Sequence, residues 1–83
     1  MQTIYKMKLN TIEDVKSFVD AANEYKGRIT VRNMHYAVDG KSIMGIFSID
    51  LSGILDVEFD NEPSNEILDL FKNWRVKWRK FVF

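Results

Sequence analysis

The chain alternates between two hydrophobic spacings, one typical of strands and one typical of helices. Its first segment, residues 2–9, places Tyr5, Met7 and Leu9 at every second position, with lysines between them. A repeat of two residues turns one face of a strand toward a core. Residues 2–9 therefore predict a β-strand.

The next segment has the spacing of an amphipathic helix. Apolar residues recur every three to four positions over residues 12–25, which predicts a helix with one buried face. Gly27 follows closely enough to end this helix, because glycine readily adopts the left-handed conformation that closes many helices. Two capping pairs stand in front of it, Asn10 with Glu13 and Thr11 with Asp14.

The middle of the chain predicts a hairpin. Residues 28–33 are rich in β-branched side chains, which favour strands. Residues 36–38 continue the strand pattern after a short break at Met34 and His35. We therefore expect two antiparallel strands joined by a tight turn.

A short helix and a fourth strand follow the hairpin. Ser42 precedes a compact apolar stretch and is well suited to cap a helix. We expect this helix to stop between residues 50 and 53. Residues 54–59 then alternate cleanly and predict the fourth strand.

The final segment is the most periodic part of the chain. Its aromatic and aliphatic side chains recur at helical spacing, so it predicts an amphipathic helix that covers a sheet face. Ser64 and Asn65 offer its start, and its acids precede its bases, as the helix dipole favours. The predicted buried stripe consists of Ile67, Phe71, Trp74, Trp78 and Phe81.

The order of predicted elements is β-α-β-β-α-β-α, which indicates an α+β fold. We expect a four-stranded antiparallel sheet covered on one face by three helices, an open-faced β-sandwich. The chain has 83 residues and shows no repeat or linker, so we expect residues 1–83 to form a single domain. Because it lacks cysteine, disulfides and thiolate metal sites are excluded.

Hydropathy indicates where the protein is located, whereas its charge does not identify a partner. Twelve basic and twelve acidic residues cancel, although residues 50–69 hold seven acids without a base and residues 72–80 hold five bases without an acid. The N-terminal residues lack the apolar run of a signal peptide, and no stretch approaches a membrane span. We therefore expect a cytoplasmic location.

Few side chains suit catalysis or metal binding. The single histidine, His35, falls in the predicted turn without a cysteine or second histidine to act with it. Asp56, Glu58, Asp60 and Glu62 alternate, and we interpret them as a solvated face rather than an acid–base pair. The sequence predicts no enzyme, no cofactor and no metal site.

The C-terminal sequence WRVKWRKFVF mixes bases and aromatic rings, as nucleic-acid binders do. Stacking on bases requires exposed rings, whereas the predicted helix turns Trp74 and Trp78 inward. We therefore expect no nucleic-acid and no membrane partner. An interaction module that binds a protein through this basic C-terminal helix stays as an alternative.

The order of elements and the central motif KSIMG, residues 41–45, together resemble the HPr family. HPr is the phosphocarrier of the bacterial sugar phosphotransferase system, and KSIMG is similar to a signature of its Gram-positive members. The resemblance runs without gaps from about residue 10 to about residue 66. The family has the open-faced sandwich that the hydrophobic pattern predicts. Further matching positions are Val19, Ala22, Tyr25, Gly40, Ser48 and Gly53.

The resemblance implies that the phosphocarrier site is missing. In the family a histidine at the amino end of the first helix accepts the phosphoryl group, and an arginine steadies it. Thr11 stands at the histidine position, Glu13 at the arginine position and Asp14 at that of a proline. Carboxylates repel phosphate, and a threonine ester is a poor phosphoryl donor. Thr11 as an atypical acceptor is the alternative.

The resemblance also implies a regulatory site at Ser42. The family's serine in KSIMG is phosphorylated by an HPr kinase with ATP, and the product is a co-repressor of a LacI-type regulator. Ile43, Met44 and Phe47 match the family's apolar docking patch. Paralogues that lack the histidine and act only in catabolite regulation are similar to this arrangement.

Ser42 also has a purely structural explanation, since an N-cap alone stabilises a helix by about 1 kcal/mol. A cap accounts for a serine but not for the whole KSIMG string. The sequence therefore predicts an HPr-like, non-catalytic regulatory protein that meets its partners through the Ser42 helix. Glu13, where the family's arginine engages the regulator, leaves the co-repressor step open.

Overall fold

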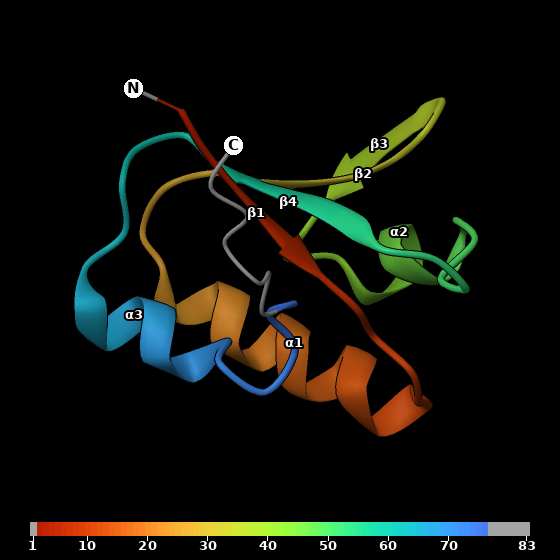
Figure 1. Cartoon of the computed structure of the whole chain (residues 1–83), viewed down its shortest axis with the longest axis horizontal. Helices are drawn as coiled ribbons and strands as arrows, with labels where there is room; N and C mark the ends of the chain where they lie inside the picture. The colour runs from red at the N-terminus through yellow and green to blue at the C-terminus, as the bar shows by residue number, and fades with distance from the viewer. Residues whose placement is uncertain (1, 77–83) are drawn as a thin grey trace, which may run out of the picture.

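The computed structural model describes residues 2–76 and contains seven elements in the predicted order (Figure 1). The four strands form one antiparallel sheet in the spatial order β1-β4-β2-β3. The elements are β1 (Thr3–Met7), α1 (Ile12–Glu24), β2 (Ile29–Asn33), β3 (Tyr36–Asp39), α2 (Ile43–Phe47), β4 (Leu55–Phe59) and α3 (Asn65–Leu70).

The helices cover one face of the sheet and leave the other face open. Figure 1 shows α1 and α3 side by side beneath the sheet, with α2 under its other end. Ile46 of α2, Phe18 of α1 and Phe71 after α3 are fully buried in one core. The predicted α+β open-faced sandwich is confirmed.

Alternation along the strands decides which side chains enter this core. β4 lies between β1 and β2, and its Leu55, Val57 and Phe59 are fully buried. Val57 pairs with Tyr5 of β1 on one side and Val31 of β2 on the other. Because paired residues share a face, these side chains form one apolar layer against the helices.

α1 begins at the capping box that its sequence predicts. The Oγ1 of Thr11 accepts a hydrogen bond from the Asp14 N–H at 3.0 Å. Tyr25 caps the other end, so Gly27 does not close the helix as we expected, and none of the described glycines has a positive φ. A Cβ at Gly27 would lie 2.2 Å from Oδ1 of Asp60. Gly27 therefore allows the backbone to approach Asp60 closely, and it does not end the helix.

The hairpin and the short helix are also present. Asn33 pairs with Tyr36 across the turn, in which Met34 has a φ of 48°. Ser42 caps α2, and Ser48 caps its other end. α2 is therefore shorter than expected, because its C-cap comes before residues 50–53.

The predicted long C-terminal helix is wrong beyond Leu70. Phe71 caps α3, and the following residues turn back along β1. The N–H of Lys8 donates to the carbonyl of Trp74 at 2.8 Å, and the N–H of Val76 donates to the carbonyl of Lys6 at 2.9 Å. The basic C-terminal helix proposed as an interaction module is thus absent from the described part of the segment.

The helical spacing of these residues did not indicate a helix, because two other features explain their burial. One is packing in the core, and the other is pairing of the segment with β1. Phe71 is fully buried, with ring centroids 5.3 Å from Phe18 and 5.6 Å from Phe59. β1 is an edge strand, whose free backbone groups need partners. The segment around Trp74 supplies those partners. Trp78 and Phe81, the rest of the predicted stripe, lie outside the described residues.

Candidate docking and phosphorylation site

The start of α1 and the end of α2 lie side by side on the molecular surface. A hollow of about 300 Å³ lies between them. Thr11 and Ile12 line it from the α1 side, and Phe47 lines it from α2. The fold therefore brings the two segments that the sequence singles out to a single surface.

The start of α1 is occupied by its own carboxylate. Oδ2 of Asp14 accepts from the N–H of Asn10 at 2.9 Å and from the N–H of Thr11 at 3.2 Å. The hydrogen bond from Asn10 is the main cause that holds the pKa of Asp14 below its usual value. Glu13 is exposed beside it. The backbone donors that could steady a bound anion are thus shared with a negative charge.

Ser42 is half-buried at the start of α2. Its Oγ accepts a hydrogen bond from the Gly45 N–H at 3.0 Å. A Cβ at Gly45 would lie 3.3 Å from this Oγ and 3.4 Å from Cβ of Val38. The glycine of KSIMG therefore leaves room around the serine hydroxyl.

Lys41, just before the serine, is held by the fold. Its backbone N–H donates to Oδ1 of Asp39 at 2.9 Å. Its ammonium donates to the carbonyl of Tyr25 at the end of α1. The lysine thus ties α2 to the end of α1.

The three predicted partner-binding residues have different surroundings. Ile43 is half-buried and packs against the core. Met44 is 78% exposed and Phe47 is 44% exposed, although both are large and apolar. Ile12 of α1 is 63% exposed. We call Ile12, Met44 and Phe47 the α1–α2 surface.

Two further residues border this surface that the sequence pattern did not single out. Leu51 and Ser52, in the loop after α2, line the hollow. The Lys8 ammonium donates to the Ser52 carbonyl at 2.7 Å and joins that loop to the end of β1. No local pattern signals this contact, since the two residues are 44 positions apart.

The structure offers no competing centre at the single histidine. His35 lies exposed in the turn between β2 and β3. Across residues 2–76, no group of three or more histidine or acidic side chains is placed to hold a metal ion. In the same part of the chain, no helix has the length and hydropathy to span a membrane.

Fold and surface define a small open-faced α+β sandwich with an exposed apolar patch beside a serine-capped helix. A family profile described as the PTS HPr component phosphorylation site matches residues 14–72. The chain belongs to this HPr family of the phosphotransferase system. The match begins at residue 14, after Thr11. The assignment of Thr11 to the family's histidine position therefore rests on the sequence resemblance alone.

Two solved structures share this fold. HPr-C-His from Thermoanaerobacter tengcongensis is 22% identical, with 88% of each chain covered and a TM-score of 0.68. The phosphocarrier protein HPr from Bacillus anthracis str. Ames is 21% identical over 88% of this chain and 96% of that one, also with a TM-score of 0.68. No curated protein sequence matches the chain.

Proposed function

We propose that this protein is a non-catalytic regulatory member of the HPr family. In this proposal Ser42 is a phosphorylation site, the α1–α2 surface binds protein partners, and the carrier function is absent. One observation carries it: a capping serine and exposed apolar side chains stand together on α2, while the start of α1 has no histidine. The partners are an HPr kinase that uses ATP and a LacI-type regulator, in the cytoplasm.

The start of α1 supports the loss of the carrier function. Thr11 takes the histidine position in this proposal, and its Oγ1 is already the helix cap. A phosphoryl group there would meet the lowered-pKa carboxylate of Asp14 and the neighbouring Glu13. Like charges at such short range are unfavourable, even when solvent screens them.

The start of α2 is a better place for a phosphate. A phosphoserine at an N-cap keeps its oxygens near backbone N–H donors and adds about 1.5–2 negative charges. At Ser42 this charge would stand within one helical turn of Met44 and about one and a half turns from Phe47. Phosphorylation would therefore change the surface from apolar to amphipathic, which can switch partner choice.

Phosphate transfer by an HPr kinase tests the first part of the proposal. The protein is incubated with HPr kinase and ATP, and intact mass reports phosphate uptake. We expect uptake by the wild type and none by Ser42→Ala. Ser48→Ala is the matched control, because Ser48 is an exposed serine at the other end of α2. Equal uptake by Ser42→Ala, or none by the wild type, would remove Ser42 as the target.

Docking through the α1–α2 surface is tested separately by binding to the kinase in the absence of ATP. We expect Met44→Ser to weaken binding about tenfold, since interface hot spots of this kind contribute more than 1 kcal/mol. Met34→Ser is the control, because Met34 is 92% exposed in the turn between β2 and β3 and does not line the hollow beside α2. Equal affinities of both variants would contradict docking at α2.

The carrier alternative has its own assay. Phosphoenolpyruvate and the first phosphotransferase enzyme should leave the protein unphosphorylated. Phosphate uptake that Thr11→Ala abolishes would instead make it a carrier with an atypical acceptor.

A further inference from the structure

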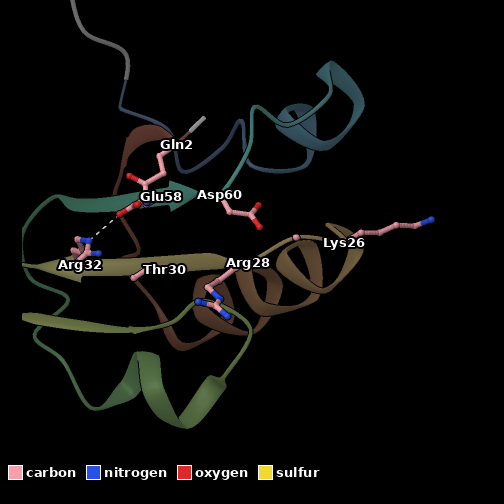
Figure 2. A pocket seen from close by; sticks show the side chains of 8 residues that line it. Gln2, Lys26, Arg28, Thr30, Arg32, Glu58 and Asp60 are labelled. Carbon is pink, nitrogen blue, oxygen red and sulfur yellow. Dashed lines mark hydrogen bonds and ion pairs between the residues drawn. The ribbon is translucent and has the colours of Figure 1, made fainter.

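A second hollow, of about 460 Å³, lies on the open face of the sheet (Figure 2). The two carboxylates that line it are already paired within the fold. Glu58 is only 8% exposed and accepts from Nε of Arg32 at 2.9 Å. Asp60 accepts from the Tyr25 hydroxyl at 2.7 Å, and this bond is the main cause that lowers the pKa of Asp60. These strand acids are thus not merely a solvated face, as the sequence suggested for them, and the fold itself explains their pairing.

The residues that follow α3 connect instead to the first hollow, the one between α1 and α2. Trp74 is held from two sides: its ring centroid lies 5.9 Å from that of Phe18 in α1, and its carbonyl accepts from the N–H of Lys8 at 2.8 Å. The guanidinium of Arg75 lies 4.7 Å from the ring centre of Tyr5 in β1, within the range of a cation–π contact. Trp74 is therefore fixed between α1 and the end of β1.

One path from Trp74 to the hollow runs through Asp14. The indole Nε1–H of Trp74 donates to Oδ1 of Asp14 at 3.4 Å. The other oxygen of this carboxylate accepts from the N–H groups of Asn10 and Thr11, and both of these residues line the hollow. The bond from Asn10 is the main cause of the low pKa of Asp14, and the bond from Trp74 lowers it further. A single carboxylate thus joins Trp74 to the α1 side of the hollow.

A second path runs through Lys8, which also lines the hollow. Its backbone N–H is bound to the Trp74 carbonyl, and its ammonium donates to the carbonyl of Ser52 at 2.7 Å. Ser52 belongs to the loop after α2 and lines the hollow as well. Because Lys8 is bound at both ends, it links Trp74 to the α2 side of the hollow.

We propose that Trp74 is a positioning residue for the α1–α2 surface. Trp74 itself is not among the residues that line the hollow. It acts through Asp14 and Lys8, which hold the two sides of the hollow in the arrangement that a partner binds. This inference rests on the proposed docking of a protein partner at that surface. Because coupling between two sites is reciprocal, a bound partner also holds residues 71–76 against β1.

The first test uses the free protein and the variant Trp74→Phe, which keeps a ring beside Phe18 but removes the indole N–H. We expect the pKa of Asp14 to rise toward its usual value, because one hydrogen bond to the carboxylate is lost. The amide hydrogens of Asn10 and Thr11 should exchange faster. NMR titration and hydrogen exchange measure both effects.

Asn73→Ala is the matched control, since Asn73 is the exposed neighbour of Trp74 and does not line this hollow. It should leave the pKa of Asp14 and both exchange rates as in the wild type. Unchanged values in Trp74→Phe, or equal changes in the two variants, would overturn the inference.

The second test measures affinity for the HPr kinase in the absence of ATP. We expect Trp74→Phe to weaken binding about threefold or more, as changes along a coupled network do, and Asn73→Ala to bind as the wild type does. In an Asp14→Ala background, Trp74→Phe should have little further effect, because the indole N–H acts through that carboxylate. Exchange at the Val76 N–H, which donates to the Lys6 carbonyl outside the hollow, should slow when the kinase binds.

The outcomes separate this inference from the proposed docking. Binding that Met44→Ser weakens and Trp74→Phe leaves unchanged would overturn the inference and keep docking at α2. Fully additive effects of Trp74→Phe and Asp14→Ala would show that the ring only packs, and would overturn it as well. If the wild type does not bind the kinase at all, the proposed docking fails, and the role of Trp74 in it fails too.

Discussion

Each described helix begins with a hydroxyl side chain that accepts from the backbone N–H three residues later. Thr11, Ser42 and Ser64 do this at 3.0, 3.0 and 3.2 Å. Capping is local, so single residues suffice to predict it. What makes Ser42 different is its surroundings, because exposed Met44 and Phe47 follow it. That difference comes from packing and not from the cap.

The lowered pKa of Asp14 predicts that the folded protein loses stability in acid. The folded pKa of Asp14 lies below the usual 3.8, so its contribution to stability is complete above that value and is lost as the pH falls through the folded value. Asp14→Asn keeps the acceptor oxygen but removes the charge. We expect the free energy of unfolding of this variant to fall less between about pH 7 and pH 2.5, by about 0.3–1 kcal/mol. Urea unfolding at both pH values measures it.

Asp20→Asn is the control for this pH series. Asp20 is exposed on α1 beyond the first turn, away from the capping box. The free energy of unfolding of the Asp20→Asn variant should fall between the two pH values by the same amount as that of the wild type. If Asp14→Asn follows the wild type too, the carboxylate of Asp14 does not stabilise the helix start.

At the scale of elements, the sequence predicted six of the seven elements to within a few residues. The seventh, α3, begins after Ser64 as expected but ends at Leu70. Its length could not be read from spacing, because a buried turn residue and a buried helix residue look alike in sequence. The contact between Trp74 and β1 is long-range, and no local pattern encodes it.

Phe71 should anchor this last element. It is fully buried against Phe18, Phe59 and Trp74, with ring centroids 5.3–5.9 Å away. We expect Phe71→Ala to lower the free energy of unfolding by about 3–5 kcal/mol, because it leaves a cavity in the core. Leu70→Ala is the control: Leu70 is 44% exposed and should cost about 1 kcal/mol or less. Similar losses in chemical denaturation would contradict this role of Phe71.

The whole molecule has one core and two separate surfaces. Helices α1 and α2, strands β1, β2 and β4, and Phe71 at the end of α3 contribute to the same buried cluster. The α1–α2 surface lies at the end of β1, and a hollow lined by charged side chains such as Arg32 and Glu58 lies on the open face of the sheet.

A single core predicts a single unfolding transition. Tryptophan fluorescence and far-ultraviolet circular dichroism should give the same urea midpoint, as two-state unfolding requires. Trp74 packs against Phe18 and reports on the segment after α3, while dichroism reports on the helices and sheet. A fluorescence midpoint at clearly lower urea would show that the C-terminal segment detaches before the sheet unfolds.

The sequence by itself determined the order of elements, the caps and the inward faces of the strands, because these depend on neighbouring residues. It also pointed to Ser42, since KSIMG is contiguous. The tertiary structure decided where α3 ends, that Ile12 meets Phe47 at one hollow, and that Glu58 pairs with Arg32. Each of these depends on residues distant in the chain, which only the packing of the sheet and helices brings together.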